Sequence, residues 1–264
     1  MRITYVGHAT TLIEIGGVTV LTDPNFDPAL GRYLPRVTPP AIALDALPLL
    51  DAVMITHAHL DHLSLVSLAA LGTSVPTFAP PSLAQWLRAE GFGHVVALAP
   101  GGEADLGHGV RVTTARARHM GARYGYDRWR GDANMYLFDS GSESCFFAGD
   151  TGLGDETHQM PADLLGRQGR KLDVALLPIG AGPWYKPRFR NGHLTSGDAF
   201  ELMRRLDARV LMPYHWGTFR HVTAGAHDAI RELRALLPGY ELRERVRIVE
   251  PGGRLEIEGL GNRD

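Results

Sequence analysis

A dense group of candidate metal ligands lies between residues 57 and 62. His57, His59 and His62 supply three imidazoles, and Asp61 supplies a carboxylate. The apolar run at 51–55 directly precedes them and predicts a buried strand, and ligand sites commonly form where such a strand ends. Hydrogen bonding in a turn would explain any one of these histidines. Four buried ligand groups would lose their water partners at a cost in free energy, so together they predict a metal site.

Three further candidate ligands follow other apolar runs. His119 comes after the run at 110–118, Asp150 lies in a Gly-Asp-Thr-Gly stretch after an apolar run, and His215 follows the run at 210–214. Taken singly, each has an ordinary interpretation, such as a turn residue between glycines for Asp150. Their repeated position after apolar runs favours convergence on the same site as residues 57–62.

The elements that position these residues are short strands followed by strands mixed with helices. A Gly-Gly pair at 16–17 predicts a hairpin between its flanking strands, and a proline-rich loop at 26–40 is expected near the site or as a mere connector. Strands are predicted at residues 3–5, 11–15, 18–22, 51–55, 75–78, 95–98, 110–115, 135–138, 145–148 and 174–178. Helices are predicted at 63–71, 82–90, 196–206 and 224–237. Two sheets flanked by helices fit this order.

Composition narrows the class of protein. The 264 residues are 44% hydrophobic and 21% charged, which predicts one globular domain over 1–264. A formal net charge of -2 argues against nucleic acid as a partner. The single cysteine, Cys145, and a strand-like start in place of a signal peptide predict a cytoplasmic protein. No apolar run is long enough to cross a bilayer, while peripheral membrane contact and a homo-oligomer stay open.

The order of these ligands resembles the metallo-β-lactamase fold superfamily. The pattern His-x-His-x-Asp-His is followed by a later His, an Asp in Gly-Asp-Thr-Gly and a last His. The motifs VGHAT at 6–10, LTDP at 21–24 and HWGTF at 215–219 are similar to one branch of it. That branch contains N-acylphosphatidylethanolamine phospholipase D and the ascorbate-6-phosphate lactonases. These motifs are specific for the branch and carry little information about the substrate.

The resemblance implies an α/β (α+β) fold, a four-layer αβ/βα sandwich with metals in a cleft at one edge between the sheets. It assigns His57, His59 and His119 to one metal, Asp61, His62 and His215 to a second, and Asp150 as the bridge. Asp61 thereby counts as catalytic as well as a ligand. Two divalent ions are implied, with zinc favoured and manganese or iron accepted by the same ligands. A hydroxide bridging the two ions would be the nucleophile.

Other residues are candidates for catalysis or substrate binding. His193 lies just before a helix and resembles a catalytic non-ligand histidine of the branch, with a helix-entry residue as the alternative. Arg123 and Lys186 come from two arginine- and lysine-rich stretches and suit an anionic group, unless they pair with nearby acids. Tyr214 and Trp216 are expected to form apolar pocket walls or to pack in the core. His8 is expected to be structural, hydrogen-bonding beneath the site.

Three functions follow from this site. The first is hydrolysis of a phosphodiester or other anionic ester, of phospholipase D type, with a small-molecule or lipid-like anionic substrate. The second is a lactonase or esterase that acts on a phosphorylated small molecule, because both reactions use the same metal site. The third is a non-catalytic metal-binding protein, which the complete set of seven candidate ligands disfavours.

Overall fold

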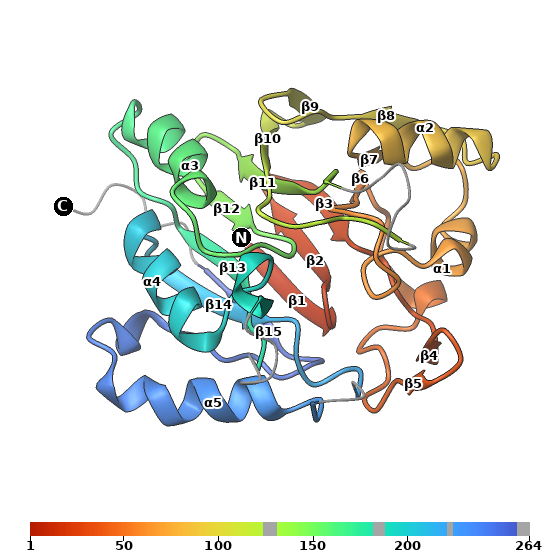
Figure 1. The fold of residues 1–264 in the computed structure, drawn as a ribbon. Coiled ribbons are helices and arrows are strands. Elements are labelled where there is room, and N and C mark those ends of the chain that lie inside the picture. The colour runs from red at the N-terminus through yellow and green to blue at the C-terminus, as the bar shows by residue number, and fades with distance from the viewer. Residues whose placement is uncertain (124–130, 182–187, 221–223, 258–264) are drawn as a thin grey trace.

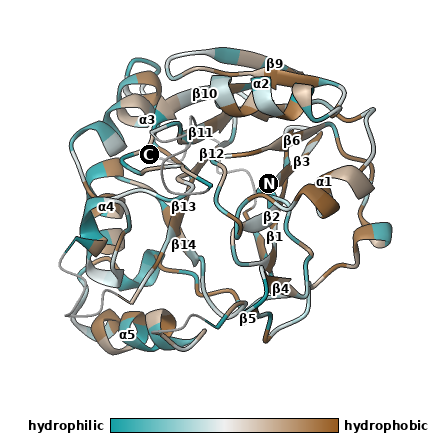
Figure 2. Cartoon of the chain, turned by 45° about the vertical axis from the view of Figure 1, so that its right-hand side comes forward, coloured by the Kyte–Doolittle hydropathy of each residue, from teal (hydrophilic) through white to brown (hydrophobic). Residues whose placement is uncertain are grey.

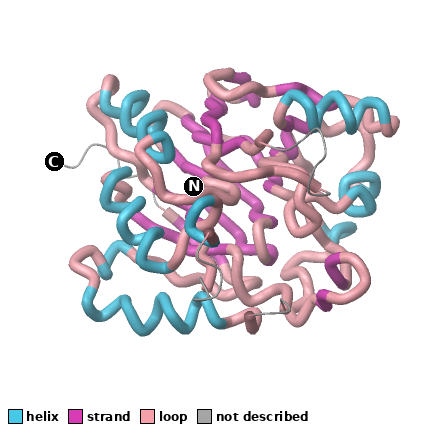
Figure 3. Tube along the Cα trace, in the orientation of Figure 1, coloured by secondary structure: helices cyan, strands magenta, loops and turns pink. Residues whose placement is uncertain are grey.

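The computed structural model describes residues 1–123, 131–181, 188–220 and 224–257. Two mixed sheets lie against each other in this part of the chain, and helices cover their outer faces (Figure 1). Figure 3 shows the same arrangement, with helices at the outside and strands between them. The predicted fold class, a four-layer αβ/βα sandwich, is confirmed.

The first sheet combines an antiparallel half with a parallel half. Its strand order is β15 (Arg254–Glu256), β1 (Arg2–Gly7), β2 (Thr10–Ile15), β3 (Val18–Thr22), β6 (Ala52–Met54), β7 (Thr77–Ala79) and β8 (Val95–Ala97). The predicted hairpin joins β2 to β3, and Ile15 pairs with Val18 across its turn. From β3 to β8 the neighbouring strands are parallel. Their carboxyl ends therefore meet at one edge of the sheet.

The second sheet has the same mixed character. Its strand order is β14 (Val210–Tyr214), β13 (Val174–Pro178), β12 (Ser144–Phe147), β11 (Asn134–Asp139), β10 (Val110–Arg116) and β9 (Glu103–Gly107). Strands β12, β13 and β14 run parallel, whereas β9 to β12 are antiparallel neighbours. The loops after β12 and β14 consequently leave the sheet at the same edge.

Helices bury one face each against these sheets. The helices are α1 (Leu65–Ala70), α2 (Pro81–Ala89), α3 (Glu156–Gly166), α4 (Ser196–Leu206) and α5 (Asp228–Leu236). Helices α1 and α2 pack on the first sheet, where Leu68 and Leu83 join a buried cluster with Val53 of β6. Helices α3 to α5 lie on the side of the second sheet (Figure 1). Figure 2 shows hydrophobic and hydrophilic residues alternating along α5, as expected for a helix with one buried face.

Several elements differ from the prediction. Helix α1 begins only at Leu65, because Ser64 caps it by accepting a hydrogen bond from the Ser67 amide. Helix α3 was not predicted, and Pro161 lies inside it. The proline-rich loop contains a small two-stranded pair, and short turns of 3-10 helix occur elsewhere. These are β4 (Ala29–Leu30), β5 (Leu34–Pro35), η1 (Leu44–Ala46), η2 (Phe189–Asn191), η3 (Leu237–Gly239) and η4 (Arg243–Arg245).

No helix in the described ranges combines the length and the hydropathy needed to cross a bilayer.

Candidate metal centre

The seven predicted ligands lie together because each follows a strand that ends at the same edge. The loop at 57–62 follows β6 of the first sheet. His119, Asp150 and His215 follow β10, β12 and β14 of the second sheet. Packing of the two sheets brings these loops together, and the candidate ligand atoms form two groups.

The first group consists of His57, His59, His119 and Asp150. One candidate ligand atom from each lies within 4.8 Å of those of the other three. The Nδ1 atom of His59 is 3.0 Å from Nε2 of His57 and 3.1 Å from Nε2 of His119. Three ring nitrogens from two sheets therefore converge on one point.

Hydrogen bonds on the far side of these rings set which nitrogens carry lone pairs. The Thr56 hydroxyl donates to Asp23, so it accepts from Nδ1 of His57 at 3.0 Å. Nδ1 of His119 donates to the Gly192 carbonyl oxygen at 2.7 Å. Both Nε2 atoms consequently present lone pairs toward Nδ1 of His59, which has at most one proton to share. A cation satisfies all three nitrogens, so the donor set fits a metal ion.

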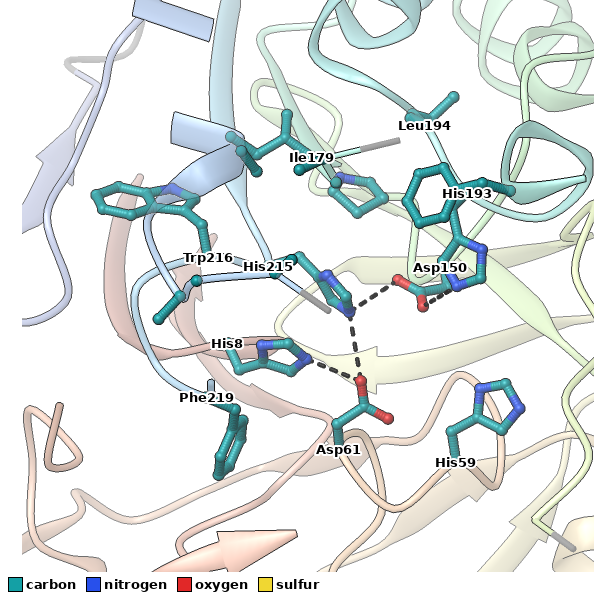
Figure 4. A pocket seen from close by; sticks show the side chains of 18 of the residues that line it. His8, His59, Asp61, Asp150, Ile179, His193, Leu194, His215, Trp216 and Phe219 are labelled. Carbon is teal, nitrogen blue, oxygen red and sulfur yellow. Dashed lines mark hydrogen bonds and ion pairs between the residues drawn. The ribbon is translucent and has the colours of Figure 1, made fainter. Parts of the chain in front are cut away.

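The second group consists of His8, Asp61, His62 and His215. Nε2 of His62 lies 3.3 Å from Nε2 of His215, which lies 3.5 Å from Oδ2 of Asp61. Nε2 of His8 is 2.9 Å from the same Asp61 oxygen. Figure 4 shows this carboxylate facing the neighbouring rings of His8 and His215, with a dashed line to each.

Asp150, a member of the first group, also approaches the second group. Its Oδ2 atom is 3.4 Å from Nε2 of His62, and its Oδ1 atom is 3.3 Å from Nε2 of His215. The residue is only 2% exposed, and Oδ1 makes no hydrogen bond. A buried carboxylate oxygen without a hydrogen bond carries a large desolvation cost. This orphaned oxygen is a second observation that fits a metal ion, and a bridging role for Asp150 stays a prediction.

The charge states of four of these groups also suit metal binding. His62 differs, because burial would lower the pKa of its ring but the carboxylates of Asp150, Asp61 and Asp23 outweigh burial and raise that pKa well above its usual value. Burial lowers the pKa of His57 well below its usual value and lowers the pKa of His119 to about 3, so both rings are neutral. Burial alone would raise the pKa of Asp61 and Asp150, but neighbouring histidines outweigh it and hold both values well below the usual range. Neutral imidazoles and ionised carboxylates are the forms that bind divalent ions.

Sequence reasoning missed the role of Asp23. The carboxylate of this fully buried residue lies 2.8 Å from Nδ1 of His62 and accepts hydrogen bonds from the amide and the hydroxyl of Thr56, each at 2.7 Å. Asp23 therefore orients His62 directly and His57 through Thr56. The motif LTDP at 21–24 was a signal for this residue, because it places an acid at the end of a buried strand.

His8 is closer to the site than predicted. It does hydrogen-bond to Asp61, as a structural residue would, but its Nε2 atom is also a candidate ligand in the second group. Its ring centroid is 3.9 Å from that of His215. The VGHAT motif at 6–10 was the available signal.

A cavity of about 780 Å³ opens above both groups. The polar end is lined by His8, His59, Asp61, Asp150, His193 and His215. Nε2 of His193 lies 3.5 Å from Oδ2 of Asp150, and its ring stacks on Phe189 with centroids 4.8 Å apart. Figure 4 shows His193 and Asp150 facing each other across this end. His193 is 35% exposed and is therefore accessible from the cavity.

Of the predicted substrate-binding residues that the structure describes, one lines the cavity and two do not. Trp216 lines the cavity, as expected. Tyr214 does not, because its fully buried hydroxyl donates to the Gly149 carbonyl oxygen, which corrects the predicted pocket wall. Arg123 also lies outside the described lining, and its guanidinium donates to the carbonyl oxygens of Ala58 and Leu63.

The described lining contains a different cation, and one predicted residue has no described position. Arg188, from the second basic stretch, lines the cavity. Lys186 lies outside the described residues. Anion binding by Arg123 and Lys186 stays a prediction, and the contacts of Arg123 favour support of the ligand loop at 57–62.

Comparison with known proteins places this geometry in context. Residues 18–216 match a family model described as a beta-lactamase superfamily domain. The chain is 29% identical over 239 residues to N-acyl-phosphatidylethanolamine-hydrolyzing phospholipase D 1 of Caenorhabditis elegans. The match covers 82% of this chain and 64% of that relative. It is 30% identical over 256 residues to a UPF0173 metal-dependent hydrolase of Methanopyrus kandleri. That match covers 96% of this chain and 98% of the archaeal protein.

A solved structure gives the same picture at the level of the fold. The crystal structure of a possible metal-dependent hydrolase from Veillonella parvula superposes with a TM-score of 0.78 at 18% identity, over 97% of this chain and 99% of that one. The chain spans less than two thirds of the length of the nematode phospholipase, but nearly the whole length of the archaeal hydrolase.

Proposed function

The chain belongs to the β-lactamase superfamily, and we propose that it is a binuclear metal-dependent hydrolase that cleaves an anionic ester, with phosphodiesters as the first substrate class. The observation that carries this proposal is the position of the two ligand groups at the polar end of one cavity. Metals at a cavity floor can reach a bound substrate, whereas a purely structural metal site is usually closed.

Each residue of the site has a defined task in this proposal. His57, His59 and His119 would hold one ion, His62 and His215 with Asp61 would hold the other, and Asp150 is placed to serve both because it belongs to the first group and lies within 3.4 Å of His62 and His215. Divalent ions held there would supply Lewis acidity and lower the pKa of a bound water toward about 7. Asp23 and Thr56 keep the ligand rings in the required tautomer and orientation.

His193 supplies the proton for the leaving group. It faces the cavity beside Asp150 without belonging to either ligand group. Phe189 stacks on its ring, which restricts the ring to one orientation. A histidine that contacts the reacting atoms without binding metal is suited to donate a proton to the leaving oxygen.

Two observations support an anionic ester. Arg188 lines the cavity, and a guanidinium binds phosphate or carboxylate in two-pronged fashion. The nematode relative is named as a phospholipase D, which cleaves a phosphodiester. Arg188 is the one arginine or lysine among the described lining residues, which suits a substrate of low charge and keeps a lactone or carboxylic ester as the second candidate.

A substrate panel tests this proposal. Zinc-, manganese- and iron-loaded protein is assayed with bis(p-nitrophenyl) phosphate, an aryl lactone and an aryl thioester, before and after chelation. We expect turnover of the phosphodiester that is lost on chelation and restored by added metal. Faster turnover of the lactone would favour the second candidate. Full metal occupancy without turnover of any ester would favour a non-catalytic metal-binding protein.

A further inference from the structure

The cavity changes character along its length. Apolar side chains adjoin the polar end: Phe189 stacks on His193, and the Phe219 ring lies 5.2 Å from that of His8. Ile179, Leu194 and Trp216 line the same cavity, and these five residues together with five small residues are called its apolar end. Ile179, Leu194, Trp216 and Phe219 are at most 2% exposed, so they form a rigid backing rather than mobile surface groups. In this part of the described lining, Arg188 is the one charged side chain, and it is exposed.

Small residues leave this apolar end open. Gly180 and Ala181 follow β13, while Ala224, Gly225 and Ala226 precede α5, and all five line the cavity. None of them has a side chain longer than one methyl group. A larger side chain at Ala181, Ala224 or Ala226 would occupy space that the substrate would otherwise use, whereas a Cβ atom at Gly180 would overlap the ring of Phe189.

We propose that the apolar end binds a compact, uncharged, apolar group, such as an aromatic ring, that is attached to the ester held at the polar end. This inference rests on the proposed hydrolase function. Pockets of 300 to 1,000 Å³ typically enclose drug-sized ligands, and this cavity has about 780 Å³. Each methylene buried against such walls strengthens binding about fourfold.

The charges of the lining disfavour a cationic group at this end. Asp61 and Asp150 lie at the polar end among the metal ligands, and no other carboxylate occurs in the described lining. An ammonium group at the apolar end would therefore lose water without gaining an acidic partner, and Arg188 would repel it. The apolar end would thus select substrates by the size and shape of an uncharged group next to the ester. The polar end would select them by the negative charge of the ester itself.

Binding of phosphonates to the zinc-loaded protein tests this inference without requiring turnover. Methylphosphonate, phenylphosphonate and dodecylphosphonate are titrated by calorimetry, the last below its micelle concentration. We expect phenylphosphonate to bind at least tenfold more tightly than methylphosphonate and at least as tightly as dodecylphosphonate. In Ala226→Trp, the ratio of phenyl to methyl affinity should fall toward one. Ala89→Trp, on the exposed end of α2, should keep the wild-type ratio.

The possible failures are distinguishable. Equal binding of methyl- and phenylphosphonate would overturn the apolar subsite and leave the proposed function intact. Absence of binding by every phosphonate to zinc-loaded protein would count against the proposed function itself, and the subsite would fall with it. A clear preference for dodecylphosphonate would show a site for long chains and overturn the compact group. Ala181→Leu repeats the test at a second wall position, should Ala226→Trp lower the melting temperature strongly.

Discussion

Oδ2 of Asp23 lies 2.8 Å from Nδ1 of His62, although 39 residues separate the two in the chain. The same oxygen accepts the hydroxyl of Thr56, whose Oγ1 atom is 3.0 Å from Nδ1 of His57. One buried carboxylate therefore orients a histidine in each of the two ligand groups. Loss of its charge should disturb both groups together.

Asp23→Asn is expected to weaken metal binding by about 10- to 100-fold, the usual cost of losing a partner behind a ligand. The amide presents one acceptor oxygen where three donors now converge. Competition with a chromogenic chelator measures the affinity. Asp51→Asn is the matched control. Asp51 is an exposed aspartate whose carboxylate accepts one hydrogen bond, from the backbone amide of Thr19. Equal affinity in the Asp23 variant and wild type would contradict the proposed role.

His193→Ala should lower kcat by about 10²- to 10⁴-fold, the range typical of a lost general acid. Its metal content should match wild type, because His193 belongs to neither ligand group. Elemental analysis and steady-state kinetics on the phosphodiester measure the two effects separately. His193→Gln keeps a hydrogen-bond donor and should recover part of the loss. An unchanged kcat in the alanine variant would remove His193 from the mechanism.

Gly180→Ala should lower both stability and turnover. A Cβ atom at Gly180 would overlap the ring of Phe189, which stacks on His193 at an interplanar angle of 18°. Overpacking of this kind costs about 1–3 kcal/mol and would displace the His193 ring. Gly197→Ala is the control, since nothing lies within 4 Å of a Cβ at that helical position. It should gain roughly 0.4–1 kcal/mol. Similar melting temperatures and kcat values in both variants would count against this prediction.

Metal removal should lower the melting temperature. An ion present at 100 times its Kd stabilises the folded state by about 2.7 kcal/mol, provided that it does not bind the unfolded chain. For a domain of this size the expected shift is on the order of 5–10 °C. Calorimetric scans with zinc and with chelator measure it. Asp150→Ala should show a much smaller difference between the two scans, and a wild-type shift in that variant would argue against Asp150 as a ligand.

Asp198 should make the loop that carries His193 sensitive to acid. Burial alone would raise the pKa of Asp198, but hydrogen bonds from Arg190 and Thr195 outweigh it and hold the pKa below its usual value. The folded pKa is depressed, so this stabilisation is present above the unfolded value of about 3.9 and is lost as pH falls through the folded value. Because Arg190 is 66% exposed, most of the effect comes from the capping hydrogen bonds.

Asp198→Asn is therefore expected to lose about 1 kcal/mol at pH 7, because the amide keeps one acceptor oxygen but loses the charge that strengthens the hydrogen bonds from Thr195 and Arg190. The difference from wild type should narrow below about pH 3, where the wild-type carboxyl is protonated. Urea unfolding at pH 7, 5 and 3 measures both values. A difference that is independent of pH would show that the charge of Asp198 has no part in stability.

Local patterns in the sequence were sufficient to predict much of the fold and the candidate ligands. Apolar runs marked strands such as β6 and β13, because strand burial leaves a short-range signal in the chain. His57, His59, Asp61 and His62 marked the first ligand loop because the four lie within six consecutive positions, which is also a short-range signal. The family assignment suggested by these motifs was confirmed by the match over residues 18–216.

The sequence by itself thus determined which residue types were present at the strand ends, and only the tertiary structure decided how they meet. The membership of His8 in the second group, the hydrogen bond from His62 to Asp23 and the inward direction of the Tyr214 hydroxyl all depend on contacts between distant segments. The apolar end of the cavity likewise joins residues after β13 to residues before α5. Such contacts depend on the packing of two sheets and on ring orientation, which have no period along the chain.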